Sequence, residues 1–224
     1  MDHTATLFKT ADSFLSQMCS GVLREPHGPK PRLESLTDLI FGLALSIGAL
    51  ALLKNNPDSV SGLWIGVGIF GFSFLILISI WLRYTETMSV LPIETSVTRT
   101  LNILLLFLVA LEPYLFNLIG SSLSEDASVA YAIDIGSIYA ILASFNNILT
   151  SQGRVLVQPD LVRKYRVIRN LQIGVAIIFW ISIIPGSYTS LQIGPIGVPL
   201  RFILWMTTFL LSRGTWVLRR MGRI

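Results

Sequence analysis

Six apolar stretches, each about the length of a membrane-spanning helix, dominate this sequence of 224 residues. A helix that crosses the hydrocarbon core of a bilayer needs about 20 mostly apolar residues. We therefore predict an all-α membrane protein with six transmembrane helices per subunit. The six stretches cover approximately residues 33–53, 62–82, 101–120, 127–149, 167–184 and 198–217.

The composition excludes the main alternatives to a membrane protein. Only 13% of the residues are charged and 52% are hydrophobic, whereas soluble domains average about 25% charged residues. So few charges cannot cover a water-exposed surface, which argues against a soluble enzyme and against a disordered chain. The chain has one cysteine, Cys19, so a scaffold built on intrachain disulfides is excluded as well.

The positions of the basic residues predict the orientation of the chain. If both termini lie on one side of the membrane, that side holds 15 of the 17 Lys and Arg residues, all except Lys54 and Arg201. The positive-inside rule then places both termini in the cytoplasm. The net charge of +4 therefore reports orientation, and we expect a multi-pass protein of the plasma membrane with no nucleic-acid partner.

The sequence divides into three regions around the apolar stretches. Residues 1–31 form a cytoplasmic segment, in which residues 4–23 have the spacing of an amphipathic helix that lies on the membrane or packs on another subunit. Residues 32–218 form the six-helix domain, and residues 219–224 form a basic tail. A basic segment ahead of the fifth stretch is either a solvated flank or a site for anionic lipid: Arg163, Lys164, Arg166 and Arg169.

The chain carries no recognisable catalytic or metal-binding motif. His3 and His27, the two histidines, both precede the first apolar stretch, and no zinc-protease, nucleophile-elbow or phosphate-loop pattern is present. We expect no enzymatic activity, no cofactor and no resident metal.

The first apolar stretch contains an acid and a polar stripe that require an explanation. Asp38 lies about one turn inside the stretch, where a charge is costly unless it pairs or faces water, and Arg32 is a candidate partner. The acid belongs either to a gating or assembly network or to a simple helix cap. Further along, one helical face is expected to carry Leu43, Ser46, Ile47 and Leu50. Such a stripe lines a pore or serves ordinary packing.

Three segments of the sequence resemble the transmembrane protein 175 family of potassium-permeable cation channels. The segment from Arg32 to Ser46 resembles the motif that opens the family's first helix, with Arg32-Leu33-Glu34 and Thr37-Asp38 in matching places. Trp81-Leu82-Arg83-Tyr84 resembles the end of the second helix. Leu101-Asn102, followed by Phe107 and Pro113, resembles the third.

This resemblance implies a homotetramer with the first helix of each subunit around a central pore. It implies a constriction and selectivity region at Leu43, Ser46, Ile47 and Leu50. It also implies a polar network that holds the pore helix, at Arg32, Leu36, Thr37, Asp38, Trp81, Tyr84 and Asn102. The sequence departs from the family pattern at several of these positions. Leu36 replaces an aromatic residue, Tyr84 a histidine and Ser46 a threonine, and Thr37 replaces a serine but keeps its hydroxyl.

The acidic residues of the third and fourth stretches are expected on the outer side of the membrane. There they would make the outer surface acidic and concentrate cations: Glu112, Glu125, Asp126 and Asp134. The leading hypothesis is a passive potassium-permeable channel. A proton-coupled transporter that uses intramembrane carboxylates and a non-conducting membrane scaffold are the alternatives.

Overall fold

The structure is a computed structural model that describes residues 31–54, 60–91, 95–119, 124–152, 159–193 and 196–220. The chain forms two compact units, Met1–Leu36 and Thr37–Ile224, so the boundary falls inside the first described helix. The amphipathic helix predicted over residues 4–23 lies outside the described residues. The division into regions at residues 31 and 218 stays a prediction.

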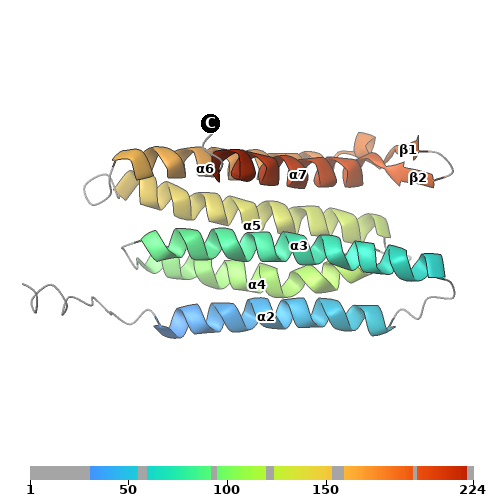
Figure 1. Ribbon diagram of the computed structural model, residues 1–224, viewed down its shortest axis with the longest axis horizontal. Coiled ribbons are helices and arrows are strands. Elements are labelled where there is room, and N and C mark those ends of the chain that lie inside the picture. Colours follow the sequence, from blue (N-terminus) through green and yellow to red (C-terminus); the bar gives the residue numbers. More distant parts are fainter. Residues whose placement is uncertain are drawn as a thin grey trace, which may run out of the picture. The chain divides into compact units, whose positions relative to one another are not determined.

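Each of the six apolar stretches contains a helix, as predicted (Figure 1). Within the described ranges, three helices are long and apolar enough to cross a membrane, over Gly66–Val90, Ser96–Leu118 and Glu125–Ser151. The helices are α2 (Pro31–Lys54), α3 (Val60–Val90), α4 (Ser96–Leu118), α5 (Ser124–Gln152), α6 (Pro159–Ile181) and α7 (Leu200–Arg220).

Two helices extend well beyond the apolar stretches that predict them. Helix α3 continues to Val90 instead of ending near residue 82, and α6 begins at Pro159 instead of residue 167. Both extensions are polar, and the hydroxyls of Thr85 and Thr87 donate to backbone carbonyls one turn earlier. Hydropathy detects only the part of a helix that lies in lipid, so it misses polar continuations of this kind.

A short β-hairpin between α6 and α7 is a feature that the all-α expectation missed. Strands β1 (Ser190–Ile193) and β2 (Ile196–Pro199) pair antiparallel after a single turn of 3₁₀-helix over Pro185–Tyr188. The sequence predicts a break here, and strands of four residues are too short to give a readable alternation.

Helix α5 is the central element of the unit Thr37–Ile224. It packs against α3, α4 and α6, and α6 in turn packs against α7 (Figure 1). The core of the unit includes Tyr131, Ile135, Ile138, Leu142 and Phe145 of α5, all fully buried. Their spacing of three or four residues places them in a broad stripe along the helix.

Trp205 joins α7 to this core through aromatic contacts. Its ring stacks on Phe179 of α6, with ring centroids 5.6 Å apart, and lies 5.2 Å from the ring of Tyr131. Its indole Nε1 donates to Ser182 Oγ at 2.9 Å, so the polar atom of this fully buried side chain has a partner.

Candidate functional site

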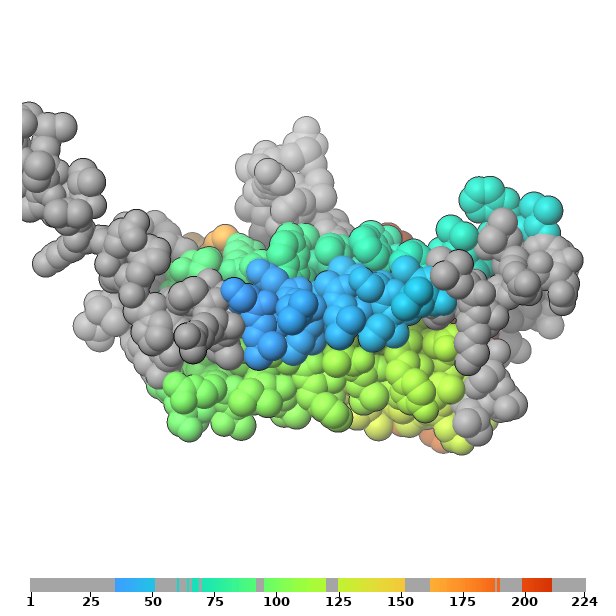
Figure 2. All heavy atoms as spheres, turned by 90° about the horizontal axis from the view of Figure 1, so that it is seen from below, coloured from blue at the N-terminus to red at the C-terminus, as the bar shows by residue number. Residues whose placement is uncertain are grey.

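Helix α2 has one buried face and one exposed face within the unit that begins at Thr37. Thr37, Phe41 and Ala44 are at most 2% exposed, and Phe41 lies against Tyr84 of α3. The exposed large side chains of the helix are Leu39, Leu43, Ile47 and Leu50, at 66%, 57%, 45% and 61%. Figure 2 shows the described part of α2 in blue at the surface, with this outer side uncovered by other described residues.

The exposed residues are the ones that the sequence places on one helical face. Leu43, Ser46, Ile47 and Leu50 are all exposed, so the structure brings the four predicted constriction residues to one uncovered face. Packing among the described residues of the subunit does not bury these four side chains. Their role as a constriction stays a prediction.

Ser46 presents its oxygen outward from this face. Its hydroxyl donates a hydrogen bond of 2.8 Å to the carbonyl of Gly42 on the preceding turn. A hydroxyl has one donor and two acceptor lone pairs, so the bond uses the proton and leaves the lone pairs available. A ring of such oxygens has the chemistry to replace part of a cation's hydration shell.

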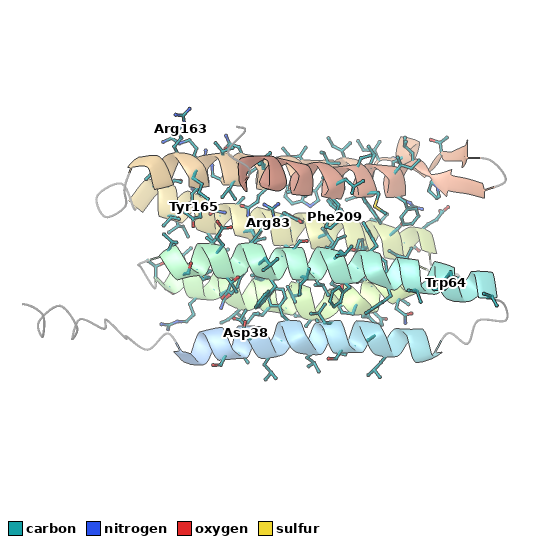
Figure 3. All side chains as sticks on the ribbon, in the orientation of Figure 1. Asp38, Trp64, Arg83, Arg163, Tyr165 and Phe209 are labelled. Carbon is teal, nitrogen blue, oxygen red and sulfur yellow. The ribbon has the colours of Figure 1, made fainter. Side chains whose placement is uncertain are left out.

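Two side-chain hydrogen bonds connect the beginning of α2 to the middle of α3. The indole Nε1 of Trp81 donates to Asp38 Oδ1 at 2.9 Å, and the hydroxyls of Thr37 and Tyr84 lie 3.3 Å apart. Figure 3 shows Asp38 on the side of α2 that faces the other helices. The structure therefore brings together four of the seven residues predicted for the polar network.

Neither Asn102 nor Leu36, two further residues predicted for the network, joins these hydrogen bonds in the described part of the chain. Asn102 of α4 is 1% exposed, and neither its Oδ1 nor its Nδ2 has a hydrogen-bond partner in the described part of the chain. Leu36 is 45% exposed. Arg32 is in α2, but its side chain lies outside what the structure describes, so its pairing with Asp38 stays a prediction.

The expectation that Glu112 and Asp134 belong to an acidic outer surface is wrong. Glu112 of α4 is fully buried and Asp134 of α5 is 2% exposed, because both side chains face the interior of the helix bundle. By contrast, Glu125 and Asp126 are exposed in the first turn of α5, where the helix dipole favours negative charge.

Glu112 pairs with hydroxyl groups. Its Oε1 accepts from Ser73 Oγ of α3 at 2.8 Å and from the Tyr131 hydroxyl of α5 at 3.3 Å. Arg201 of α7 is also buried, and one of its side-chain nitrogens donates to Ser128 Oγ of α5. Ser73, Ser128 and Tyr131 are single polar residues within apolar stretches, and sequence reasoning missed them because nothing in their spacing points to Glu112.

A second buried polar contact joins α3, α5 and α6. Asn146 Nδ2 donates to Gln172 Oε1 at 2.7 Å, and the Thr87 hydroxyl lies 3.4 Å from Asn146 Oδ1. All three residues are buried. Amides and hydroxyls of this kind hold helices together in an apolar environment.

The basic residues at the start of α6 differ in their surroundings. Lys164 forms an ion pair with Glu86 of α3 at 2.7 Å, and Arg169 donates to Asn147 of α5 at 2.9 Å. Arg163 and Arg166 are exposed and have no ion-pair partner among the described residues. Figure 3 shows Arg163 pointing away from the other helices.

Residues 32–113, which span α2, α3 and most of α4, match the family model described as "Endosomal/lysosomal potassium channel TMEM175". A search of curated proteins gives no significant match.

Two solved structures share the fold. One is a variant of the potassium channel MtTMEM175 in complex with a nanobody–MBP fusion protein, with 18% identity and a TM-score of 0.54 over 88% of this chain and 95% of that one. The other is a lysosomal potassium-selective channel TMEM175 homolog from Chamaesiphon minutus, with 20% identity and a TM-score of 0.52 over 81% and 96%. The chain thus matches the TMEM175 family model over residues 32–113, and its helices have the fold of these two structures.

Proposed function

We propose that this chain is the subunit of a potassium-permeable cation channel, in which the exposed face of α2 lines a central pore between four copies. One observation carries the proposal. The exposed face of α2 combines large apolar side chains with an outward-facing hydroxyl, at Leu43, Ser46, Ile47 and Leu50. The family match over α2 and the two channels with the same fold support it.

The side chains of this face suit a pore that opens and closes by wetting. A ring of four Leu43 side chains excludes water when it is narrow, and it conducts when the helices move apart. The Ser46 ring, one turn further, offers oxygen atoms to a cation that has lost part of its water. Four identical copies around an axis create such a path without any further sequence.

The hydrogen bonds between α2 and α3 would set the orientation of the pore helix in this arrangement. Asp38 and Thr37 lie on the opposite side of α2 from the apolar stripe, and each contacts α3 through one side chain. A rotation of α2 that changes the pore therefore has to stretch or replace these bonds.

Potassium flux into liposomes tests the channel. We expect the purified protein to carry a passive K⁺ flux without a proton gradient, and Leu43→Ala and Leu50→Ala to change its rate or its selectivity. Ile103→Ala is the matched control, because Ile103 is an apolar residue of α4 that is 60% exposed and lies off this face.

Two outcomes count against the proposal. If the α2 variants leave both conductance and selectivity unchanged, the pore does not lie at this face. If flux requires a pH gradient and saturates at low turnover, the protein is a proton-coupled transporter.

A further inference from the structure

Tyr84 of α3 lies between side chains of α2 and α5. Its hydroxyl is 3.3 Å from that of Thr37, and its ring centroid is 6.3 Å from the rings of both Phe41 of α2 and Phe145 of α5. All four side chains are buried. Because the interior of a helix bundle is close-packed, a rotation of α2 that moves Thr37 and Phe41 also has to move Tyr84.

Thr87, almost one turn further along α3, extends this contact to the polar part of α5. Tyr84 and Thr87 are three residues apart, so they lie next to each other on one side of the helix. The hydroxyl of Thr87 is 3.4 Å from Oδ1 of Asn146, the residue that follows Phe145 in α5. A rotation of α3 about its axis that shifts Tyr84 against Thr37 therefore also shifts Thr87 against Asn146.

The side-chain amide of Asn146 connects α3 to α6. Its Nδ2 donates to the carbonyl of Leu142 at 3.1 Å and to Gln172 Oε1 of α6 at 2.7 Å. Two acceptors use both protons of Nδ2, so the orientation of the amide is fixed and Oδ1 is the atom that faces Thr87. Asn146 and Gln172 are both fully buried, so bulk solvent does not compete for these bonds.

The hydroxyl of Thr87 has one proton and two acceptors within reach. It donates to the carbonyl of Arg83 in its own helix at 2.8 Å, and Asn146 Oδ1 is the more distant acceptor at 3.4 Å. A small rotation of α3 that shortens the second distance would transfer the hydrogen bond from α3 to α5. The same atoms thus allow two arrangements in which the hydroxyl keeps an acceptor, and such a two-state contact can couple the positions of neighbouring helices.

We propose that Thr87, Asn146 and Gln172 are positioning residues for the pore helix: their contacts hold α3 against α5 and α6 and, through Tyr84, set the rotation of α2. The inference rests on the proposed channel function, because it assigns to this contact a role in opening the pore at the exposed face of α2. All three side chains are buried in the bundle, so they act through α3 and not by contact with the permeating ion.

Single-channel recording of the full-length protein in planar bilayers tests this role. Thr87→Val keeps the shape of the side chain and removes the hydroxyl, so we expect it to change the open probability by about 2- to 30-fold. Thr87→Ser keeps the hydroxyl and should stay close to the wild type. Asn146→Leu removes the other partner of the same contact. The double variant with Thr87→Val should therefore differ little from Asn146→Leu alone.

Ser182→Ala is the matched control for a general loss of stability. Ser182 Oγ accepts from the indole Nε1 of Trp205 at 2.9 Å, in a buried contact that joins the end of α6 to α7. The substitution leaves this buried N–H without its acceptor, so it should lower the midpoint temperature of unfolding. It should not change the open probability, because the contact does not involve α3 or α2.

The role is overturned if Thr87→Val and Asn146→Leu lower the unfolding midpoint but leave the open probability of the wild type unchanged. It is overturned as well if Thr87→Ser changes the open probability as much as Thr87→Val does, since the methyl group and not the hydroxyl would then matter. If Asn146→Leu does not fold, Thr87→Val decides, because it removes only one long hydrogen bond.

A measurement that does not depend on flux separates this inference from the channel proposal. Spin labels at Leu39→Cys on α2 and Val97→Cys on α4, both exposed positions, report where α2 lies by the distance between them. The labels are placed in a Cys19→Ser background, and labelled subunits are diluted with unlabelled protein.

If the protein carries no potassium flux, the channel proposal fails and the distance distribution decides the inference. A distribution that shifts or broadens with Thr87→Val, but not with Ser182→Ala, supports the link from α5 through α3 to α2. A distribution that is the same in the wild type and in Thr87→Val rejects the link.

Discussion

The indole N–H of Trp81 on α3 donates to the carboxylate of Asp38 on α2, with 2.9 Å between Nε1 and Oδ1. These two residues are 43 positions apart in the sequence. The bond connects the helix that carries the proposed pore face to its neighbour. It gives the acid, which lies near the beginning of an apolar stretch, a hydrogen-bond donor.

We expect Trp81→Phe to lower the midpoint temperature of unfolding, because the substitution removes the indole N–H and with it the hydrogen bond to Asp38. A single hydrogen bond contributes about 1 kcal/mol, which corresponds to a shift of roughly 2–4 °C for a chain of this size. Trp64→Phe is the control on the same helix, because Trp64 is 68% exposed. Equal midpoints for Trp81→Phe and the wild type would show that the bond contributes nothing.

The contact between Thr37 and Tyr84 gives a second test of how α2 is held. Tyr84→Phe keeps the ring contacts with Phe41 and Phe145, at 6.3 Å in both cases, and removes the hydroxyl. We expect the two hydroxyls to be coupled by about 1 kcal/mol. A double-mutant cycle with Thr37→Val and Tyr84→Phe, measured by unfolding in detergent, checks this value, and purely additive effects would contradict it.

The sequence predicts the number, order and approximate position of the helices because lipid imposes a length and a composition on every spanning segment. It also predicts that Trp81 and Asp38 belong together, through the resemblance to a family. The pairing of Asn146 with Gln172 could be expected only in part, since an amide inside an apolar stretch requires a partner but does not indicate which one.

The location of the acids could not be predicted in the same way. Glu112, Asp134 and Glu125 all lie in the third and fourth stretches or at their ends, and topology alone places them towards one side of the membrane. Whether an acid faces solvent or the bundle interior depends on how far each helix is rotated about its axis, and tertiary packing decides that rotation. Glu112 and Asp134 face inward, whereas Glu125 precedes the packed part of α5.

Gly136 of α5 is expected to be intolerant of any side chain. A Cβ atom built at this position lies only 2.6 Å from Cδ1 of Trp180 on α6. The ring of Trp180 therefore occupies the space that a side chain at this position would need, and Gly136→Ala should destabilise the protein by about 1–3 kcal/mol through overpacking.

Gly174→Ala is the matched control for this substitution. Gly174 lies inside α6, and a Cβ atom there meets nothing within 4 Å. Since alanine is favoured over glycine in a helix by up to about 1 kcal/mol, this variant should be as stable as the wild type or slightly more stable. Equal unfolding midpoints for the two variants would show that Trp180 moves aside at little cost.

The positive-inside rule predicts that the start of α6 lies at the cytoplasmic surface. In that position its exposed arginines are expected to bind anionic lipid. Arg163 and Arg166 are exposed and form no ion pair with the residues that the structure describes, whereas Lys164 is already paired with Glu86. A basic residue near an anionic membrane surface contributes about 1 kcal/mol. The double substitution Arg163→Gln and Arg166→Gln should therefore remove most of the stabilisation that phosphatidylglycerol gives in mixed micelles.

Lys164→Gln is the informative control, because its charge is partly used by Glu86 and its loss should have a smaller effect on lipid binding. The measurement is the rise in unfolding midpoint when phosphatidylglycerol replaces phosphatidylcholine, at low and at high salt. Added salt should weaken the rise in the wild type, since the attraction between exposed charges is screened within about 10 Å at 0.1 M ionic strength. A rise that is the same in the double variant, or that does not respond to salt, would mean that these arginines only face solvent.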